Sequence, residues 1–288
     1  MVFSGFPTNA SAALKNLSDR VARLEMEVTL CNDAELFKSP DTGWVIFCGI
    51  LVLFMQVGFA LLESGFVKTE NVVTVYVKNV LVFLLGVIPA AFWGFNVAYP
   101  DVSPHLMHLT GSGNHDGLKL SFFVFVVYQS NCLTIISGAL AERTLVLGYL
   151  TFGMYIAGFI YPLSVRFTWG GGFLSTLDPP FHDSAGSGVV HMVAGMASLT
   201  GAVVVGSRLG RWDSAKAADF EPRNISSVLF ALLVLMVGWY GFNGGASMGI
   251  STTADVEASM NAIITTTFSG VSGGLVVFVG SLVMNRLE

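Results

Sequence analysis

The sequence contains few charged residues. Asp, Glu, Lys and Arg make up 11% of the 288 residues, roughly half the content of an ordinary globular domain, whereas hydrophobic residues make up 53%. Mean hydropathy is +0.69. These values exclude a typical soluble domain and favour a protein that crosses a membrane several times. The 14 Lys and Arg residues form no basic patch, which also argues against a nucleic-acid partner.

Cysteine is scarce as well. Cys31, Cys48 and Cys132 show no CxxC or other metal-binding spacing. The sequence therefore predicts neither a disulfide framework nor a zinc site, and no cofactor is expected. Residues 1–40 also lack an apolar core long enough for a signal peptide, so the first membrane span is expected to act as its own insertion signal.

Long apolar runs dominate the rest of the chain. A helix needs about 20 apolar residues to cross a hydrocarbon core roughly 30 Å thick. Seven runs meet this length, and the sequence therefore predicts an all-α polytopic membrane protein with a tail over residues 1–40 and a transmembrane domain over residues 41–288. The predicted spans are residues 44–64, 72–98, 120–141, 144–165, 185–206, 226–248 and 258–285.

Basic residues in the loops predict the orientation. Cytoplasmic loops of membrane proteins are enriched in Lys and Arg. The loops after the first, third and fifth spans carry Lys68, Arg143, Arg208, Arg211, Lys216 and Arg223, whereas those after the second and fourth carry Lys119 and Arg166. This asymmetry places the N-terminal tail outside the cell. The tail has heptad-like spacing from Leu14 to Cys31, which favours a short amphipathic helix, and its Asn9 and Asn16 begin glycosylation sequons.

One ionisable side chain lies inside an otherwise apolar span. His191 belongs to residues 184–207, a run without Asp, Glu, Lys or Arg. Burying an ionisable group in a membrane is costly unless the group lines a pathway or finds a partner. Upstream, Trp169 begins W-G-G-G and Asp183 begins D-S-A-G-S-G-V-V-H. An aromatic ring, a carboxylate and an imidazole thus follow one approach to the bilayer, where they can attract a small cation and handle its proton.

Five motifs, in order, carry a resemblance to a known family. They are M-Q-V-G-F-A-L-L-E-S-G-F-V-K-T-E-N (55–71), I-S-G-A-L-A-E-R (136–143), W-G-G-G, D-S-A-G-S-G-V-V-H, and G-W-Y-G-F-N-G-G (238–245). In these motifs the chain resembles the ammonium transporter, methylammonium permease and Rhesus family, and the transporter branch more than the Rhesus branch. The resemblance begins at Asp41 and covers nearly the whole chain after the tail.

The resemblance implies a fold of eleven spans. Two inverted five-helix repeats and a final long helix form each subunit of a trimer, with one pore per subunit. Seven spans correspond to the first repeat and the first two helices of the second, and the family's second pore histidine, in the tenth span, has no counterpart here. We therefore expect the N-terminal part of the fold. Because inverted repeats form their path at the repeat interface, this part is not expected to form a pore alone.

The resemblance also implies roles for the same three residues. Trp169 would close an outer vestibule that recruits ammonium, Asp183 would stabilise the cation from beneath, and His191 would pass a proton or solvate ammonia within the pore. The residues by themselves permit other interpretations. Trp169 can be an interfacial aromatic, Asp183 a helix cap and His191 a structural histidine.

Two aromatics and a serine complete the implied site. Tyr128 stands where the family ordinarily has the first gate phenylalanine, and its hydroxyl needs a partner when buried. Phe242 matches the second gate ring, and simple helix packing is the alternative for both rings. Where the family has a serine that binds the recruited cation, this chain has Ala246, which makes the neighbouring Ser247 the candidate substitute.

Other ionisable groups receive structural interpretations. Glu63 and Glu142 fall at cytoplasmic ends of spans, where they are expected to cap helices or anchor loops, and Lys78 is expected to snorkel toward the interface. An outer loop rich in histidine has no fixed ligand spacing, so no metal site is expected there. Its candidate ligands are Asp101, His105, His108, His115 and Asp116.

The sequence thus predicts a transporter and not an enzyme. It would move ammonium or ammonia, with methylammonium as an analogue, through a pore in each subunit of a homotrimer embedded in the lipid bilayer of the plasma membrane. The alternative is a non-transporting fragment that acts as an ammonium sensor, or as a regulatory subunit in mixed trimers. A Rhesus-like gas channel is disfavoured by Trp169.

Overall fold

Every regular element that the structure describes is helical. The structure is a computed structural model that describes residues 40–100 and 116–284, and over these ranges the prediction of an all-α membrane protein is confirmed. Seven of its helices are long and apolar enough to cross a membrane. The heptad pattern of the tail, its sequons and the candidate ligands Asp101, His105, His108 and His115 lie outside the described residues.

The observed spans agree with the predicted ones to within five residues at each end. They are Pro40–Phe66, Thr69–Ala98, Gly117–Leu140, Val146–Thr168, Ser187–Val205, Ile225–Ser247 and Thr253–Met284. Three long helices are continuous: α2 (Pro40–Phe66), α6 (Asp116–Leu140) and α11 (Thr253–Met284). Helix α10 (Ile225–Gly244) continues into the short 3₁₀ turn η7 (Gly245–Ser247).

Three spans contain a π-helical segment. The second span consists of η1 (Thr69–Asn71), α3 (Val72–Pro89), the π segment η2 (Ala90–Gly94) and α4 (Phe95–Ala98). The fourth consists of α7 (Val146–Tyr155), the π segment η4 (Ile156–Ile160) and α8 (Tyr161–Thr168), and the fifth of the π segment η5 (Ser187–Met192) and α9 (Val193–Val205). Segments η2 and η4 lie beside Pro89 and Pro162. Because proline lacks a backbone N–H and clashes with the preceding turn, it disturbs the regular α ladder at these points.

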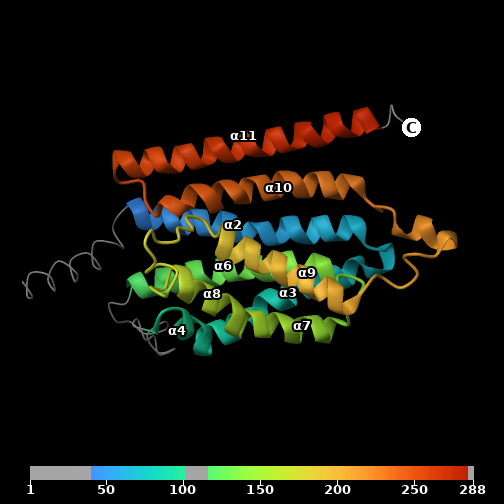
Figure 1. Ribbon diagram of the computed structural model, residues 1–288, viewed down its shortest axis with the longest axis horizontal. Helices are drawn as coiled ribbons and strands as arrows, with labels where there is room; N and C mark the ends of the chain where they lie inside the picture. The colour runs from blue at the N-terminus through green and yellow to red at the C-terminus, as the bar shows by residue number, and fades with distance from the viewer. Residues whose placement is uncertain (1–39, 101–115, 285–288) are drawn as a thin grey trace, which may run out of the picture.

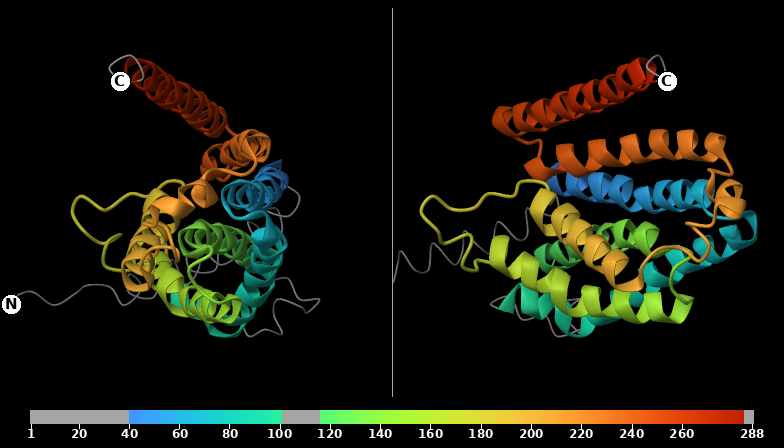
Figure 2. Two further views of the ribbon diagram at one scale, coloured as in Figure 1. Left: turned by 90° about the vertical axis from the view of Figure 1, so that its right-hand side faces the viewer. Right: turned by 45° about the vertical axis from the view of Figure 1, so that its right-hand side comes forward.

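Helix α6 occupies the centre of the bundle. It contacts α2, α3 and α9, while α10 lies along α2 in the most extensive helix contact of the described residues. Figures 1 and 2 show α11 as an outlying helix that reaches the bundle beside α10. Ser259 is its one buried residue. The core that positions the site is therefore formed by α2, α3, α6, α9 and α10.

Glu142 connects three loops at one end of the molecule, where they form what we call the basic end: residues 67–71, 141–145 and 206–224. Its carboxylate accepts hydrogen bonds from the Lys68 N–H (2.8 Å), the Asn71 side chain (2.7 Å) and the Arg208 guanidinium (2.7 Å). These contacts bring together the three loops in which the sequence concentrates Lys and Arg. The loop-anchoring role expected of Glu142 agrees with this arrangement.

The environment of Glu142 lowers its pKa. Burial alone raises the pKa, but the hydrogen bonds from Asn71, Lys68 and Arg208, together with the Arg208 charge, outweigh this effect. Because the folded-state pKa lies below the unfolded one, the stabilisation is present above the ordinary carboxyl pKa and is lost as pH falls through the lowered value.

Glu142→Ala is therefore expected to destabilise the basic end. The change removes three hydrogen bonds to a charged group and leaves the partly buried Arg208 unpaired, which should cost about 2–4 kcal/mol. Thermal unfolding in mild detergent at neutral pH measures this effect as a lower Tm. Glu70→Ala, at an exposed carboxylate of the same end, is the control and should leave Tm unchanged. Equal Tm values for the two variants would contradict the anchoring role.

Candidate functional site

Asp183 is buried and holds the start of the fifth span. Its side chain accepts hydrogen bonds from the backbone N–H groups of Gly186 (2.8 Å), Gly188 (2.9 Å) and Val189 (2.8 Å), and the residue is 8% exposed. Gly186 has φ +86°, a left-handed conformation that glycine adopts without strain. Three N–H groups at a helix start favour negative charge. The carboxylate is thus fixed in place by three backbone donors, and the helix-capping interpretation of Asp183 is confirmed.

Trp169 links the fourth span to this loop. The residue follows α8, and its indole N–H donates to the Asp183 carbonyl oxygen at 2.6 Å. Its ring centroid lies 6.0 Å from that of Tyr128 on α6. Because the indole is half-buried and held at its nitrogen, its ring orientation is fixed relative to Asp183. A fixed aromatic face can attract a small cation.

The rings of Tyr128, Phe242 and His191 form one continuous contact. Tyr128 and Phe242 meet edge to face with centroids 4.4 Å apart, and Phe242 and His191 do so at 5.2 Å. Phe242, from α10, is 1% exposed. The Tyr128 hydroxyl donates to the Phe242 carbonyl oxygen at 3.4 Å, which provides the partner that a buried hydroxyl needs. Three elements distant in sequence therefore converge on one aromatic cluster.

His191 is held by its own loop. The Nδ1 atom lies 3.3 Å from the Gly186 carbonyl oxygen. Because a carbonyl oxygen only accepts, a neutral imidazole in this contact carries its proton on Nδ1 and leaves the Nε2 lone pair available. The ring is half-buried, so Nε2 has the chemistry to accept a proton or a hydrogen bond from a small polar molecule.

Ser247 lies in the connection between α10 and α11. Its hydroxyl donates to the carbonyl oxygens of Gly244 (3.1 Å) and Gly249 (2.8 Å). These bonds shape the turn itself, and within residues 40–100 and 116–284 no hydrogen bond joins Ser247 to Trp169 or Asp183. The structure therefore brings together the other five predicted site residues, Trp169, Asp183, Tyr128, Phe242 and His191, and leaves Ser247 as a separate prediction.

Lys78 corrects one expectation. Rather than snorkelling to the interface, its ammonium group is buried and lies 2.9 Å from Glu63 Oε2. Glu63 accordingly forms a buried ion pair and does not anchor a loop. The roles of Glu63 and Lys78 were predicted only from how close each residue lies to the end of its own span. The two opposite charges on consecutive spans, separated by a short turn, were the feature that could have revealed the pair.

The described residues contain no cluster of three or more His, Cys, Asp or Glu side chains that could hold a metal ion. The arrangement of the five site residues is instead one of rings, one fixed carboxylate and one imidazole. Such a site offers a small cation an aromatic face and an imidazole nitrogen.

Comparisons with known proteins find ammonium transporters. Residues 43–287 match the family model described as Ammonium Transporter Family. The ammonium transporter Amt2 of Archaeoglobus fulgidus is 34% identical over 241 residues, which cover 75% of this chain and 50% of that protein. The Amt2 of Methanocaldococcus jannaschii is 32% identical over 281 residues, which cover 94% and 62%. The chain therefore spans about half to three fifths of the length of these curated relatives.

Solved structures share the fold. A structure titled "Sensor Amt Protein" has a TM-score of 0.64 and 26% identity, covering 74% of this chain and 56% of that one. The crystal structure of Candida albicans Mep2 has a TM-score of 0.69 at 21% identity, covering 86% and 56%. The second likeness supports the fold alone.

Proposed function

The chain belongs to the Ammonium Transporter Family, and on that premise we propose that it contributes the outer binding site and the aromatic gate of a pore for ammonium or ammonia. The observation that carries the proposal is the unbroken run of contacts from Asp183 through Trp169, Tyr128 and Phe242 to His191. The family is one of transporters and not of enzymes. Because the curated relatives are transporters, a purely sensory or regulatory role is not favoured.

The steps follow from the chemistry of each group. Ammonium approaches the Trp169 face, and the fixed Asp183 carboxylate stabilises its charge from below. The cation loses water at the Tyr128–Phe242 constriction, where apolar ring edges offer no replacement for hydration. The cation transfers its proton to a water molecule, and ammonia then passes His191, whose Nε2 lone pair can accept a hydrogen bond from it. Ser247 would contribute to recruitment through its oxygen lone pairs, which can accept a hydrogen bond from ammonium while its proton is donated within the turn.

The same proposal extends to placement in the cell. The basic end would face the cytoplasm, which would put residues 1–40 outside the plasma membrane. Each subunit of a homotrimer would contain its own pore. The support for this orientation is that all three Lys/Arg-rich loops lie at one end, held by Glu142.

Trp169→Leu tests the recruitment step. The change keeps apolar bulk but removes the cation–π face, worth about 0.5–2 kcal/mol, so the half-saturating ammonium concentration should rise by about twofold to thirtyfold. The measurement is uptake of labelled methylammonium by the full-length protein. Trp169→Phe keeps a ring without the N–H and should lose less affinity, and Trp212→Leu, at an exposed site of the basic end, should lose none. Unchanged affinity in Trp169→Leu would refute recruitment at this ring.

Tyr128→Phe tests the unusual gate residue. The hydroxyl makes a long hydrogen bond of 3.4 Å, so its removal should cost less than about 1 kcal/mol of stability. The variant is expected to fold normally and to transport at least as fast, because the ring is kept and no hydroxyl remains to bind the passing molecule. Initial uptake rates at saturating methylammonium measure this, with Tyr155→Phe on the exposed surface as control. A collapse in rate would show that the hydroxyl itself takes part in transport.

A further inference from the structure

Glu63 and Lys78 form a buried ion pair within the spans. Glu63 lies on α2 and Lys78 on α3, and their side chains are 6% and 7% exposed. The Lys78 ammonium also donates to the Ser137 carbonyl oxygen at 3.1 Å and lies 4.9 Å from the Tyr149 ring centroid. Glu63 accepts a second, longer bond of 3.4 Å from Asn79. Ionisable groups in such a position are costly, and their presence points to a function.

A polar seam leads from the gate to this pair. Asn131, Thr134 and Ser137 recur at three-residue spacing on α6, starting one turn beyond Tyr128. The Asn131 side chain donates to the Val52 carbonyl oxygen at 3.1 Å, and the Thr134 hydroxyl donates to Gln56 Oε1 at 2.5 Å. Ser137 meets Lys78 through its carbonyl oxygen. Polar groups thus follow the contact of α6 with α2 and α3 from the aromatic constriction toward the basic end.

Four buried polar atoms, three in this seam and one on Asn79 beside Glu63, have no hydrogen-bond partner among the described residues. They are Gln56 Nε2, Asn79 Oδ1, Asn131 Oδ1 and Ser137 Oγ. Asn79, Asn131 and Ser137 are each at least nine-tenths buried. Donors and acceptors that are buried in this way are characteristically satisfied by bound water.

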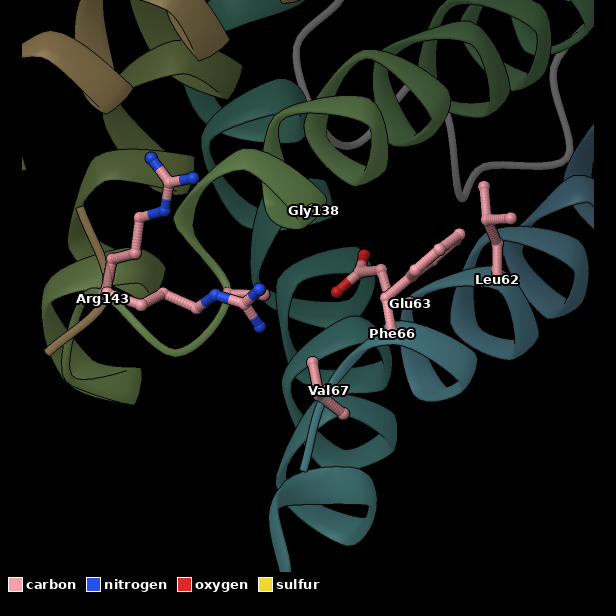
Figure 3. A pocket seen from close by; sticks show the side chains of 8 residues that line it. Leu62, Glu63, Phe66, Val67, Gly138 and Arg143 are labelled. Atoms are coloured by element: carbon pink, nitrogen blue, oxygen red, sulfur yellow. The ribbon is translucent and has the colours of Figure 1, made fainter. Parts of the chain in front are cut away.

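Glu63 also lines a cavity at the basic end. The cavity has a volume of about 280 Å³, well above the roughly 10–15 Å³ that one water requires. Figure 3 shows the Glu63 side chain between Phe66 and the α6 ribbon at Gly138, with Arg143 on the far side of the cavity. The charged or titratable groups that face the pair from the packed elements are Tyr149, Arg143 and Arg208.

We propose that Glu63 is a proton-exchange site, reached from the gate through water bound along the seam and open to the basic end through this cavity. The inference rests on the proposed function, in which ammonium gives up a proton to become ammonia. That proton passes along the seam and binds a Glu63 carboxylate oxygen, so an O–H bond forms and the ion pair with Lys78 opens. Lys78 stays protonated, held by the Ser137 carbonyl oxygen and the Tyr149 ring.

Lys78 makes this protonation transient. A buried ammonium without a counter-charge is unfavourable, so the pair re-forms as Glu63 releases its proton to water in the cavity. One proton enters and one leaves, and ammonia leaves separately. Glu63 consequently conducts the proton and does not trap it. The need to release the proton also explains why a carboxylate and an ammonium occur together here. A buried carboxylate without a neighbouring cation would retain the proton that it binds.

The test uses proteoliposomes that contain the full-length protein. It measures how much net charge crosses the membrane for each labelled methylammonium taken up. Glu63→Gln should lose most of this charge. Because Lys78 is then unpaired and the variant can misfold, the double variant Glu63→Gln/Lys78→Met removes both charges and should fold while remaining deficient. A merely structural pair would instead be rescued in the double variant. Thr134→Val interrupts the seam without altering a charge and should also lower the ratio, whereas the exposed Glu70→Gln should not.

A normal charge ratio in the double variant and in Thr134→Val would overturn the inference while leaving transport itself intact. Uptake by the unaltered protein without any net charge would overturn it as well. Absence of methylammonium uptake by the unaltered protein is a different result, since it refutes the proposed function and the inference with it.

Discussion

Asp183→Ala is expected to abolish methylammonium uptake and to destabilise the protein. The Asp183 carboxylate is shared by the N–H groups of Gly186, Gly188 and Val189. Alanine leaves these three donors unpaired at a buried helix start, at about 1–3 kcal/mol for each unsatisfied group, and removes the negative charge below Trp169. Uptake at saturating methylammonium and thermal unfolding in detergent measure the two effects on one preparation.

Asp183→Asn separates charge from shape. One carboxylate oxygen accepts from Gly186 and the other from both Gly188 and Val189, so the amide NH2 group must face at least one backbone donor. We expect this variant to be destabilised less than alanine and still to lose uptake. Asp178→Asn, at an exposed carboxylate of the same connection, is the control. Full uptake by Asp183→Asn would show that the negative charge is dispensable.

The spans were predictable because hydropathy alone locates a helix that must satisfy its backbone in lipid. The ends of the spans were less predictable. Helix α11 begins at Thr253, five residues before the predicted span. The prediction missed these residues because the first turn of the helix is polar. The Thr252 hydroxyl and the Asp255 carboxylate hydrogen-bond each other across that start. A polar first turn is invisible to a hydropathy argument, although its Thr and Asp are typical of helix starts.

The candidate site, too, could be predicted from the sequence only in part. The order of Trp169, Asp183 and His191 along the chain indicated their chemistry, whereas the contact of His191 with Phe242 depends on how α10 packs against the rest. The left-handed Gly186 that lets Asp183 reach three N–H groups follows from backbone geometry and not from residue type alone. The Glu63–Lys78 pair was missed because each charge was judged within its own span, and the pair exists only once α2 and α3 pack together.

The contact between α2 and α10 determines where the gate ring Phe242 sits. Glycines on α10 let the two backbones approach closely, as small residues do in membrane helix pairs. A Cβ atom added at Gly241 would lie 2.6 Å from Leu51 Cβ and 2.8 Å from the Cys48 carbonyl oxygen. The second neighbour is backbone and cannot rotate away. Any side chain at Gly241 must therefore push α10 away from α2 and carry the adjacent Phe242 with it.

Gly241→Val is accordingly expected to lower the free energy of unfolding by more than about 3 kcal/mol, because overpacking against backbone lies at the upper end of the costs of overpacking. The variant protein that still folds is expected to show no uptake. Gly148→Val introduces the same side chain at a helical glycine with nothing within 4 Å, so it controls for helix propensity and should leave both properties nearly unchanged. Thermal unfolding and methylammonium uptake on the folded fraction are the measurements. If Gly241→Val matched Gly148→Val in both, the close approach of α2 and α10 would not set the position of Phe242, and the aromatic gate would need another structural basis.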